Sequence, residues 1–167
     1  MTKFITEVLQ EINDNPETVK KHLTNAGLRI VLEYSYDPAK KFLLPDGVPP
    51  YKQDSAPIGM SPGNIHQEFR RFYVFCRADL TPFKREMIFV QLLENIHPKE
   101  AELMIAIKDQ ELTRLYPNLD RAFAESLGFV KPLPVAEPTL SEAVEKDPKP
   151  KTKKTPAKKA QALGTQI

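Results

Sequence analysis

Cysteine is nearly missing from this 167-residue chain, whose only thiol is Cys76. A single cysteine excludes an intramolecular disulfide and a zinc site made of several cysteines, and it fits a reducing cytosol. Long apolar runs are also missing. No stretch approaches about 18 uncharged apolar residues, so we expect no membrane-spanning helix and no membrane partner. Residues 1–14 carry acids within their apolar pattern, so we expect no signal peptide there.

The motifs that carry enzyme chemistry are missing too. None of the histidines stands four residues from another, as a zinc-protease helix requires. Gly59 and Gly63 do not have the spacing of a phosphate-binding loop. Cys76 lies on an apolar helical face, where a small core residue is more usual than a nucleophile. We therefore predict no enzyme activity, no catalytic residue, no cofactor and no metal. The histidines are His22, His66 and His97, and His97 is expected to be structural, at a helix junction.

Charge is plentiful but unevenly divided. From Lys131 onward eight basic residues face four acidic ones, which leaves sixteen basic and eighteen acidic residues before that point. The first part of the chain is therefore slightly acidic and the last part is basic, within a net charge of +2.

Residues 80–108 have the clearest predicted structure. Thr81 and Pro82 form a helix start, a capping hydroxyl followed by a proline at the first helical position. Apolar residues then recur at three- and four-residue spacing, which predicts a helix buried on most sides. Residues 97–100 (HPKE) end this helix and start another with its own apolar stripe. The apolar positions are Phe83, Met87, Ile88, Phe89, Val90, Leu92, Leu93 and Ile96, then Ala101, Leu103, Met104, Ile105 and Ile107.

Two helices are predicted at the start of the chain. Residues 2–13 form an amphipathic pattern that ends in an Asn-Asp-Asn-Pro turn. Residues 16–26 follow, starting at a capping asparagine and a proline, with Val19, Leu23 and Ala26 facing inward. Gly27 is expected to end this helix in the left-handed conformation.

Residues 28–36 (LRIVLEYSY) are ambiguous. Their β-branched and aromatic residues favour a strand, but apolar residues also recur at helical spacing and no partner strand is evident. We predict a helix. Asp37 and Pro38 then start a short helical piece that reaches residue 43 or 44.

Helical patterns return at residues 64–76 and 117–127. The first is predicted to bury Ile65, Phe69, Phe72, Tyr73 and Cys76. The second is predicted to bury Leu119, Ala122, Phe123 and Leu127 and to end at Gly128.

A loop of 19 residues, 45–63, separates these patterns and contains five prolines and three glycines. Loops of this length are uncommon inside compact domains and are often functional. Two interpretations stay open. The loop is either an irregular segment over the body, anchored by Tyr51, Ile58 and Met60, or an arm that contacts a partner.

From residue 131 the apolar pattern stops. Proline, lysine and alanine dominate, with too few apolar groups to offset the entropy of ordering the chain. We predict a helical domain over residues 1–130 and a disordered basic tail over residues 131–167. The fold class is all-α: a small, irregular helical domain with a long Pro-rich loop.

Two blocks of the sequence resemble a family of uncharacterised proteins from large tailed bacteriophages of the myovirus type. The first is residues 37–51, with DP followed by KFLLPDGVPPY, and the second is residues 84–109, with KRE, FVQLLE, IHP, EA and AIKD. The resemblance extends over about residues 28–120 and departs at residues 122–129. It implies a phage origin, a helical body and expression inside an infected bacterium. It implies no activity.

Two basic features are candidate nucleic-acid contacts. A polycation in the tail would bind phosphates without sequence preference, or would act only as a solubilising linker. A second cluster, interleaved with aromatic residues, would either grip phosphates or be a solvated face paired to Glu68 and Glu86. The tail lysines are Lys146, Lys149, Lys151, Lys153, Lys154, Lys158 and Lys159, and the cluster, called here the 70–85 cluster, is Arg70, Arg71, Arg77, Lys84 and Arg85.

These observations favour a non-catalytic phage accessory protein. Its body would bind an unknown phage or host protein, and its tail would reach DNA or RNA without specificity. The alternative is a minor virion or assembly protein, and an enzyme is the least favoured class. The expected location is the cytoplasm of the host bacterium, or the virion.

Overall fold

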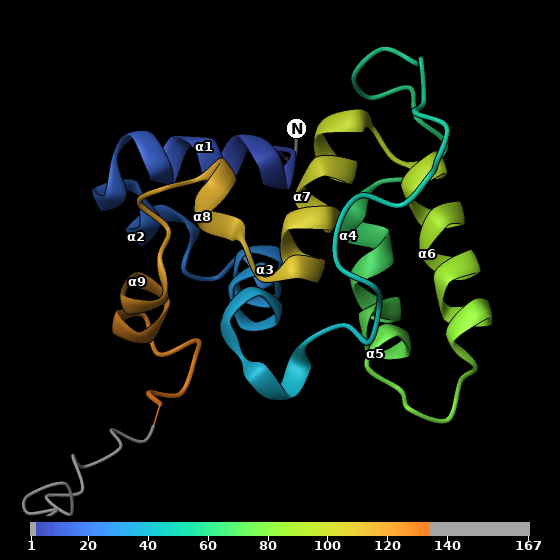
Figure 1. Cartoon of the computed structure of the whole chain (residues 1–167). Helices are drawn as coiled ribbons and strands as arrows, with labels where there is room; N and C mark the ends of the chain where they lie inside the picture. Colours follow the sequence, from blue (N-terminus) through green and yellow to red (C-terminus); the bar gives the residue numbers. More distant parts are fainter. Residues whose placement is uncertain (1–2, 134–167) are drawn as a thin grey trace, which may run out of the picture. The chain divides into compact units, whose positions relative to one another are not determined.

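Helix α7 (Pro98–Asp109) lies at the centre of the computed structural model, which describes residues 3–133 (Figure 1). Every residue from 100 to 108 except Glu102 is buried. The predicted apolar stripe of this helix is therefore confirmed, and the burial extends around almost its whole circumference. Such burial makes α7 the central element of the core, and α1, α3, α6 and α8 pack directly against it.

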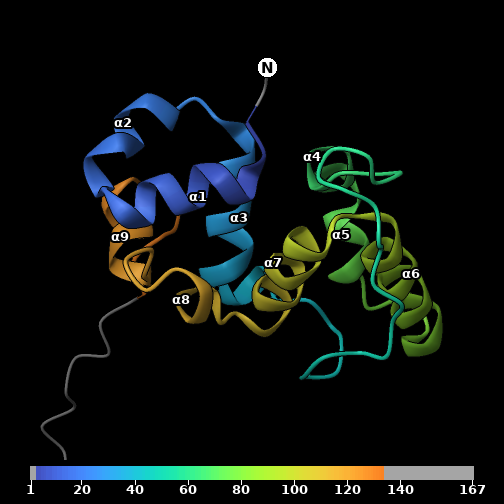
Figure 2. The same cartoon turned by 90° about the horizontal axis from the view of Figure 1, so that it is seen from above.

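The other helices pack on two sides of α7. Figure 2 shows α1, α2, α3 and α9 gathered on one side and α4, α5 and α6 on the other. The described residues contain no strand, so the predicted all-α class is confirmed, including the helix over residues 28–36. The remaining helices are α1 (Ile5–Asp14), α2 (Val19–His22), α3 (Ala26–Tyr36), α4 (Ile65–Glu68), α5 (Phe72–Phe75), α6 (Pro82–Asn95), α8 (Leu112–Leu115) and α9 (Arg121–Ser126), with 3-10 turns η1 (Pro16–Thr18), η2 (Pro38–Lys40) and η3 (Phe69–Arg71).

Side-chain caps start the helices where the sequence predicts them. Each of four capping residues accepts a hydrogen bond from the backbone N–H two or three positions later, at 3.2, 2.9, 3.4 and 3.3 Å in chain order. A proline follows each cap, as the N-terminal asymmetry of helices favours. These residues are Asn15, Asp37, Thr81 and His97. His97 thus has the structural place expected for it.

An aromatic cluster fills the core on the α6 side. The ring of Phe42 lies 5.0 Å from that of Phe75, 5.6 Å from Phe72 and 6.4 Å from Phe89, mostly edge to face. Aromatic pairs favour such tilted arrangements. Phe42 follows η2, so this contact holds the start of the long loop against α5 and α6.

The prediction for residues 16–27 is partly wrong. Leu23 is 46% exposed and Ala26 is exposed, because the chain makes the 3-10 turn η1 and a short α2 rather than one continuous helix. Gly27 does not end a helix. It lies buried in the first turn of α3, whose cap is Asn25. A Cβ at Gly27 would come within 2.8 Å of Phe69 Cε2, so close packing, not positive φ, requires glycine here.

Three further burial predictions are wrong. Turn η3 interrupts residues 64–76 and rotates the inward face, so Tyr73 is 56% exposed while Phe75 is buried. Helix α6 is not buried on most sides: Phe83 is 73% exposed and Met87 is 45% exposed. The last helix starts at Arg121, where Asp120 caps it, rather than at residue 117; Ala122 is therefore exposed.

The long loop contains no helix, as predicted. Of its expected anchors, Tyr51 packs against the core, whereas Ile58 and Met60 are 60% and 74% exposed. Helical structure after Asp37 stops at Lys40, earlier than predicted. Gly128 has the predicted positive φ, +71°. The prediction for the tail concerns mostly residues 134–167, which lie outside the described residues.

Candidate functional site

An apolar groove runs between α6 and the first part of the long loop, and we call it the α6 groove. Its volume is about 500 Å³, within the usual range for binding sites in proteins. Phe83, Met87 and Val48 are its exposed large hydrophobic side chains, and Val48 is 67% exposed. The lining is Leu44, Pro45, Asp46, Gly47, Val48, Pro49, Pro50, Phe83, Glu86, Met87, Phe89, Val90, Gln91 and Lys108.

The sequence of α6 explains the groove. Phe83, Met87 and Val90 are spaced by four and three residues, so they lie on one face of the helix. Phe89 and Leu92 lie on another face and are buried in the core. Helix α6 therefore has apolar residues on two faces, of which only one is covered within the described residues.

A buried lysine fixes the loop side of the groove. Lys108 is 2% exposed, and its ammonium donates a hydrogen bond to the carbonyl of Pro45 at 2.7 Å and pairs with Asp109. Burying an ammonium is costly unless it is paired and hydrogen-bonded. Lys108 therefore anchors the loop to α7. Sequence analysis missed this role because Lys108 stands at the polar end of an apolar stripe, where lysine is normally solvated.

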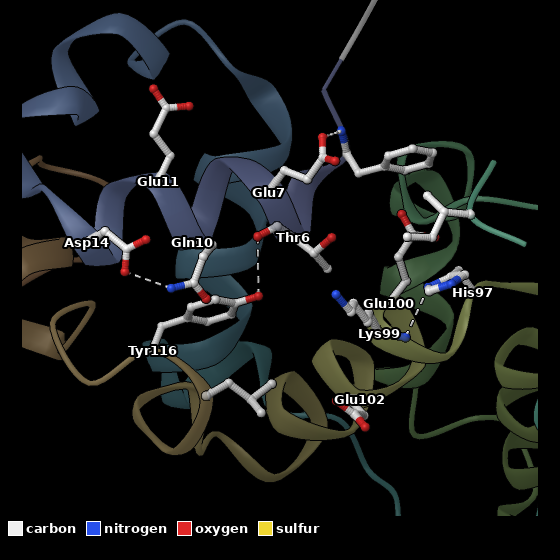
Figure 3. Close-up of a pocket in the computed structure, with 13 residues that line it drawn as sticks. Thr6, Glu7, Gln10, Glu11, Asp14, His97, Lys99, Glu100, Glu102 and Tyr116 are labelled. Carbon is white, nitrogen blue, oxygen red and sulfur yellow. Dashed lines mark hydrogen bonds between the residues drawn. The ribbon is translucent and has the colours of Figure 1, made fainter.

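A second opening lies between α1, α7 and α8, and we call it the α1–α7 pocket. Its volume is about 620 Å³. In Figure 3, Thr6 and Gln10 from α1 face Lys99 from α7 and Tyr116, which follows α8. The lining is Phe4, Thr6, Glu7, Gln10, Glu11, Asp14, Ile58, His97, Lys99, Glu100, Glu102, Leu115 and Tyr116.

Glu100 is the most unusual side chain of this pocket. It is 2% exposed, and its Oε2 accepts a hydrogen bond from the backbone N–H of Ile65 at 3.2 Å. Its Oε1 is buried and has no hydrogen-bond partner among the described residues. Burial raises the pKa of Glu100, and the hydrogen bond from Ile65 opposes that shift only in part. The sequence does not reveal this, because Glu100 looks like an ordinary acid in the first turn of a helix.

The other carboxylates of the pocket are more exposed, and Glu7, Glu11 and Asp14 accept hydrogen bonds. The hydrogen bond from Lys3 lowers the pKa of Glu11, and the Nε2 of His22 lies 3.6 Å from the same carboxylate. Asp14 accepts a hydrogen bond from Gln10 at 2.8 Å, and Glu7 accepts one from the backbone N–H of Phe4 at 3.1 Å. Tyr116 keeps its phenol proton, since burial raises its pKa to about 12.

Arg85 is not part of the surface cluster that the sequence predicts at residues 70–85. Arg85 is 5% exposed, and its guanidinium donates hydrogen bonds of 2.6, 2.7 and 2.8 Å to three backbone carbonyls. The expectation that it faces solvent as a phosphate contact is wrong. A guanidinium has five N–H donors in a fixed geometry, so one arginine can hydrogen-bond several buried carbonyls at once.

The rest of the cluster lies at the surface but does not form one free patch. Arg71 pairs with Glu68 at 3.1 Å, and Arg77 donates to Asp79 at 2.9 Å. Arg70 and Lys84 are exposed. The pairing of Arg71 matches the solvated-face interpretation. Contact with nucleic acid stays a prediction for this cluster, and the seven tail lysines lie outside the described residues.

Cys76 donates a weak hydrogen bond to the carbonyl of Lys40 at 3.4 Å, and burial raises the pKa of its thiol, which disfavours the reactive thiolate. Within residues 3–133, no three His, Cys, Asp or Glu side chains are grouped to hold a metal ion. Across the same range, no helix combines the length and apolar character that crossing a bilayer requires.

Residues 8–114 match a family of unknown function, DUF6433. The chain belongs to this family. The matched region runs from within α1 to within α8 and therefore contains most of the core, the α6 groove and most of the α1–α7 pocket. Both blocks of the phage-protein resemblance also lie inside it. No curated protein and no solved structure matches the chain.

Membership in DUF6433 defines which part of the chain the family shares. Helix α9 and everything after it lie outside the matched residues. The family has no established function, so it assigns no substrate, partner or cofactor to this chain.

Proposed function

We propose that this DUF6433 protein is a non-catalytic accessory protein of a large tailed bacteriophage, and that its body binds a helix of a partner protein in the α6 groove. The observation that carries this proposal is the uncovered apolar face of α6, with Phe83 at 73% and Met87 at 45% exposure beside the loop. The phage origin rests on the resemblance of residues 37–51 and 84–109 to proteins of such phages.

The shape and chemistry of the groove support a helical partner. Amphipathic helices bind in apolar grooves through side chains spaced by three and four residues. Phe83, Met87 and Val90 have that same spacing on α6, so two helices would interdigitate along their length. Covering an apolar side chain of this size contributes about 1.5–3 kcal/mol. Aromatic and methionine side chains are also enriched at the centres of protein interfaces.

The tail gives the proposal its second part. The lysines of residues 146–159 would add weak, non-specific attraction to DNA or RNA. We place the protein in the host cytoplasm during infection, with the virion as the alternative location. Mass spectrometry of purified particles separates the two: many copies per particle would support a virion or assembly role, and absence would support an intracellular role.

Photo-crosslinking tests the groove directly. A photoreactive phenylalanine analogue at position 83 should crosslink to a specific protein in the native host cell. The matched control places the same analogue at Tyr73, which is 56% exposed but lies outside the groove. Adding Met87→Glu to the crosslinking chain should abolish the product, because a carboxylate in the groove opposes apolar docking. Equal crosslinks from both positions, or none from position 83, would reject the proposal.

A further inference from the structure

The α1–α7 pocket carries more negative charge than its own residues neutralise. Five carboxylates line it against one ammonium, that of Lys99. Within the described residues, only one of these carboxylates, Glu11, has an ion-pair partner within 4.0 Å. Lys99 forms none with the described residues, and in Figure 3 its side chain reaches into the opening. The acids are Glu7, Glu11, Asp14, Glu100 and Glu102.

Acidic lining alone would not define a site, but Glu100 adds an independent observation. The fold uses only one of its carboxylate oxygens, the one bonded to Ile65. The other is buried without a hydrogen-bond donor from the described residues, and Glu100 is one of the residues that line the pocket. An unpaired buried acceptor is destabilising, and perturbed acids in clefts are candidate functional groups. A donor that arrives with a positive charge would satisfy both the oxygen and the local charge.

We propose that the α1–α7 pocket binds a primary alkylammonium ion, with Oε1 of Glu100 as its main acceptor. An ammonium has three donors and no acceptor, which suits a site that offers carboxylates. Phe4, Leu115 and Tyr116 provide apolar wall for the methylene chain. The aromatic rings also attract cations. Glu7 and Glu102, at other points of the wall, would take a second ammonium of a diamine.

A ligand that reaches Glu100 would have to pass the long loop, because Ile58 of this loop lines the same pocket. Ile58 is 60% exposed, so displacing it uncovers little buried area. Its neighbour Gly59 approaches the Phe4 ring, where an added Cβ would stand 3.8 Å from Cζ. The loop thus supplies a wall of the pocket as well as a wall of the α6 groove.

Two sources present this chemistry: a free polyamine, or a lysine side chain of a partner protein. Spermidine and N-acetyl-lysine methylamide represent them, and 1,8-octanediol is a neutral control of similar length. Each is titrated into the full chain while backbone amide NMR signals of α1 and α7 are followed. Shifts that saturate with spermidine alone would assign a polyamine, and shifts with the lysine derivative would assign a side chain. Either result supports the site.

Substitutions of two adjacent residues, Glu100 and Lys99, should change the affinity for the amine in opposite directions. Glu100→Gln should weaken binding at least about tenfold, the effect of losing a charge-assisted hydrogen bond. Lys99→Gln should tighten binding about two- to fivefold, because a competing cation leaves the pocket. Glu17→Gln, an exposed acid outside the pocket, should change nothing.

Glu102→Gln keeps the test valid if Glu100→Gln impairs folding, because Glu102 is exposed. It should weaken binding by a smaller factor. The proposal fails if neither amine shifts the pocket signals at millimolar concentration, if octanediol shifts them equally, or if Lys99→Gln weakens binding.

Discussion

Arg85 on α6 donates a hydrogen bond to the carbonyl of Leu43 at 2.6 Å, across 42 residues of the chain. Its second terminal nitrogen binds the carbonyls of Arg77 and Leu80 at 2.7 and 2.8 Å. One buried side chain thereby joins the start of α6, the turn before it and the beginning of the long loop. Arg85 is a structural residue that sequence composition alone assigns to a surface cluster.

Arg85→Met should destabilise the protein by about 3–5 kcal/mol, because the methionine fills the space but leaves the buried carbonyls without donors. Arg85→Lys should recover only part of this, since an ammonium cannot reproduce the planar fork. Urea denaturation measures both. Lys84→Met, at the exposed neighbouring position, serves as the control and should stay within about 0.5 kcal/mol of wild type. Equal losses at the two positions would contradict the buried role of Arg85.

Gly27→Ala should destabilise the protein by about 1–3 kcal/mol, as overpacking does in a close-packed core. This reverses the usual gain of about 0.5–1 kcal/mol for alanine over glycine in a helix. The added Cβ would stand 2.8 Å from Phe69 Cε2 and 3.1 Å from His66 Cε1. Thermal unfolding checks the sign. Ala26→Ser, one residue earlier and exposed, should have almost no effect. A stabilised Gly27→Ala variant would show that α3 and α4 are not in close contact.

Helix α6 should respond very differently at its two faces. Leu92→Ala should cost about 2–5 kcal/mol, since Leu92 is buried in the core. Phe83→Ala should cost little, because its ring is 73% exposed. Phe83 has the larger side chain, so a smaller loss of stability there reflects its exposure and not the size of the group removed. A large loss at Phe83 would mean that this face is covered in solution.

The sequence predicts the helices better than it predicts their faces. Caps at Asn15, Asp37 and Thr81 depend on local chemistry, and all three are found. The faces depend on uninterrupted helical phase. Turns η1 and η3 break that phase, so Leu23 and Tyr73 are exposed although the pattern places them inside. Nothing in the local sequence requires those 3-10 turns, which tertiary packing decides.

The candidate sites were harder to predict for a different physical reason. Glu100, Arg85 and Lys108 are charged residues, and each has a backbone hydrogen-bond partner at least 35 residues away in the chain. Periodicity carries no information about such contacts. The sequence predicts one part of the α6 groove, because Phe83 and Met87 fall on an apolar helical face. It does not predict that this face is uncovered, which only the structure shows.

Glu100→Gln should change how stability depends on pH. Burial raises the pKa of Glu100 above its ordinary 4.5 in the folded state, so the folded protein binds this proton more tightly than the unfolded chain. Its contribution is therefore most favourable below pH 4.5 and declines as pH rises through the folded pKa. Glutamine stays neutral, so the stability of the variant relative to wild type should increase from pH 4.5 to neutral pH. Urea denaturation at both pH values measures this.

Other titratable groups line the same pocket, among them His97, Lys99 and Glu7. Glu7→Gln is therefore the control. An equal pH effect in that variant would assign the titration to another group.

Nucleic-acid binding should depend on the tail. Seven lysines lie between residues 146 and 159 against one acid, Asp147, whereas Arg71 and Arg77 of the body are paired and Arg85 is buried. If about five lysines meet duplex phosphates, log K should fall against log salt with a slope of about −4 to −5. Removing residues 146–167 should abolish this binding and leave the melting curve and any partner of the α6 groove unchanged.

If the shortened chain binds DNA as tightly as the full chain, the site must lie in the body, where Arg70 and Lys84 are the exposed cations of the 70–85 cluster to replace first. If neither form binds at low salt, the basic segment acts only as a solubilising extension and the nucleic-acid part of the proposal falls.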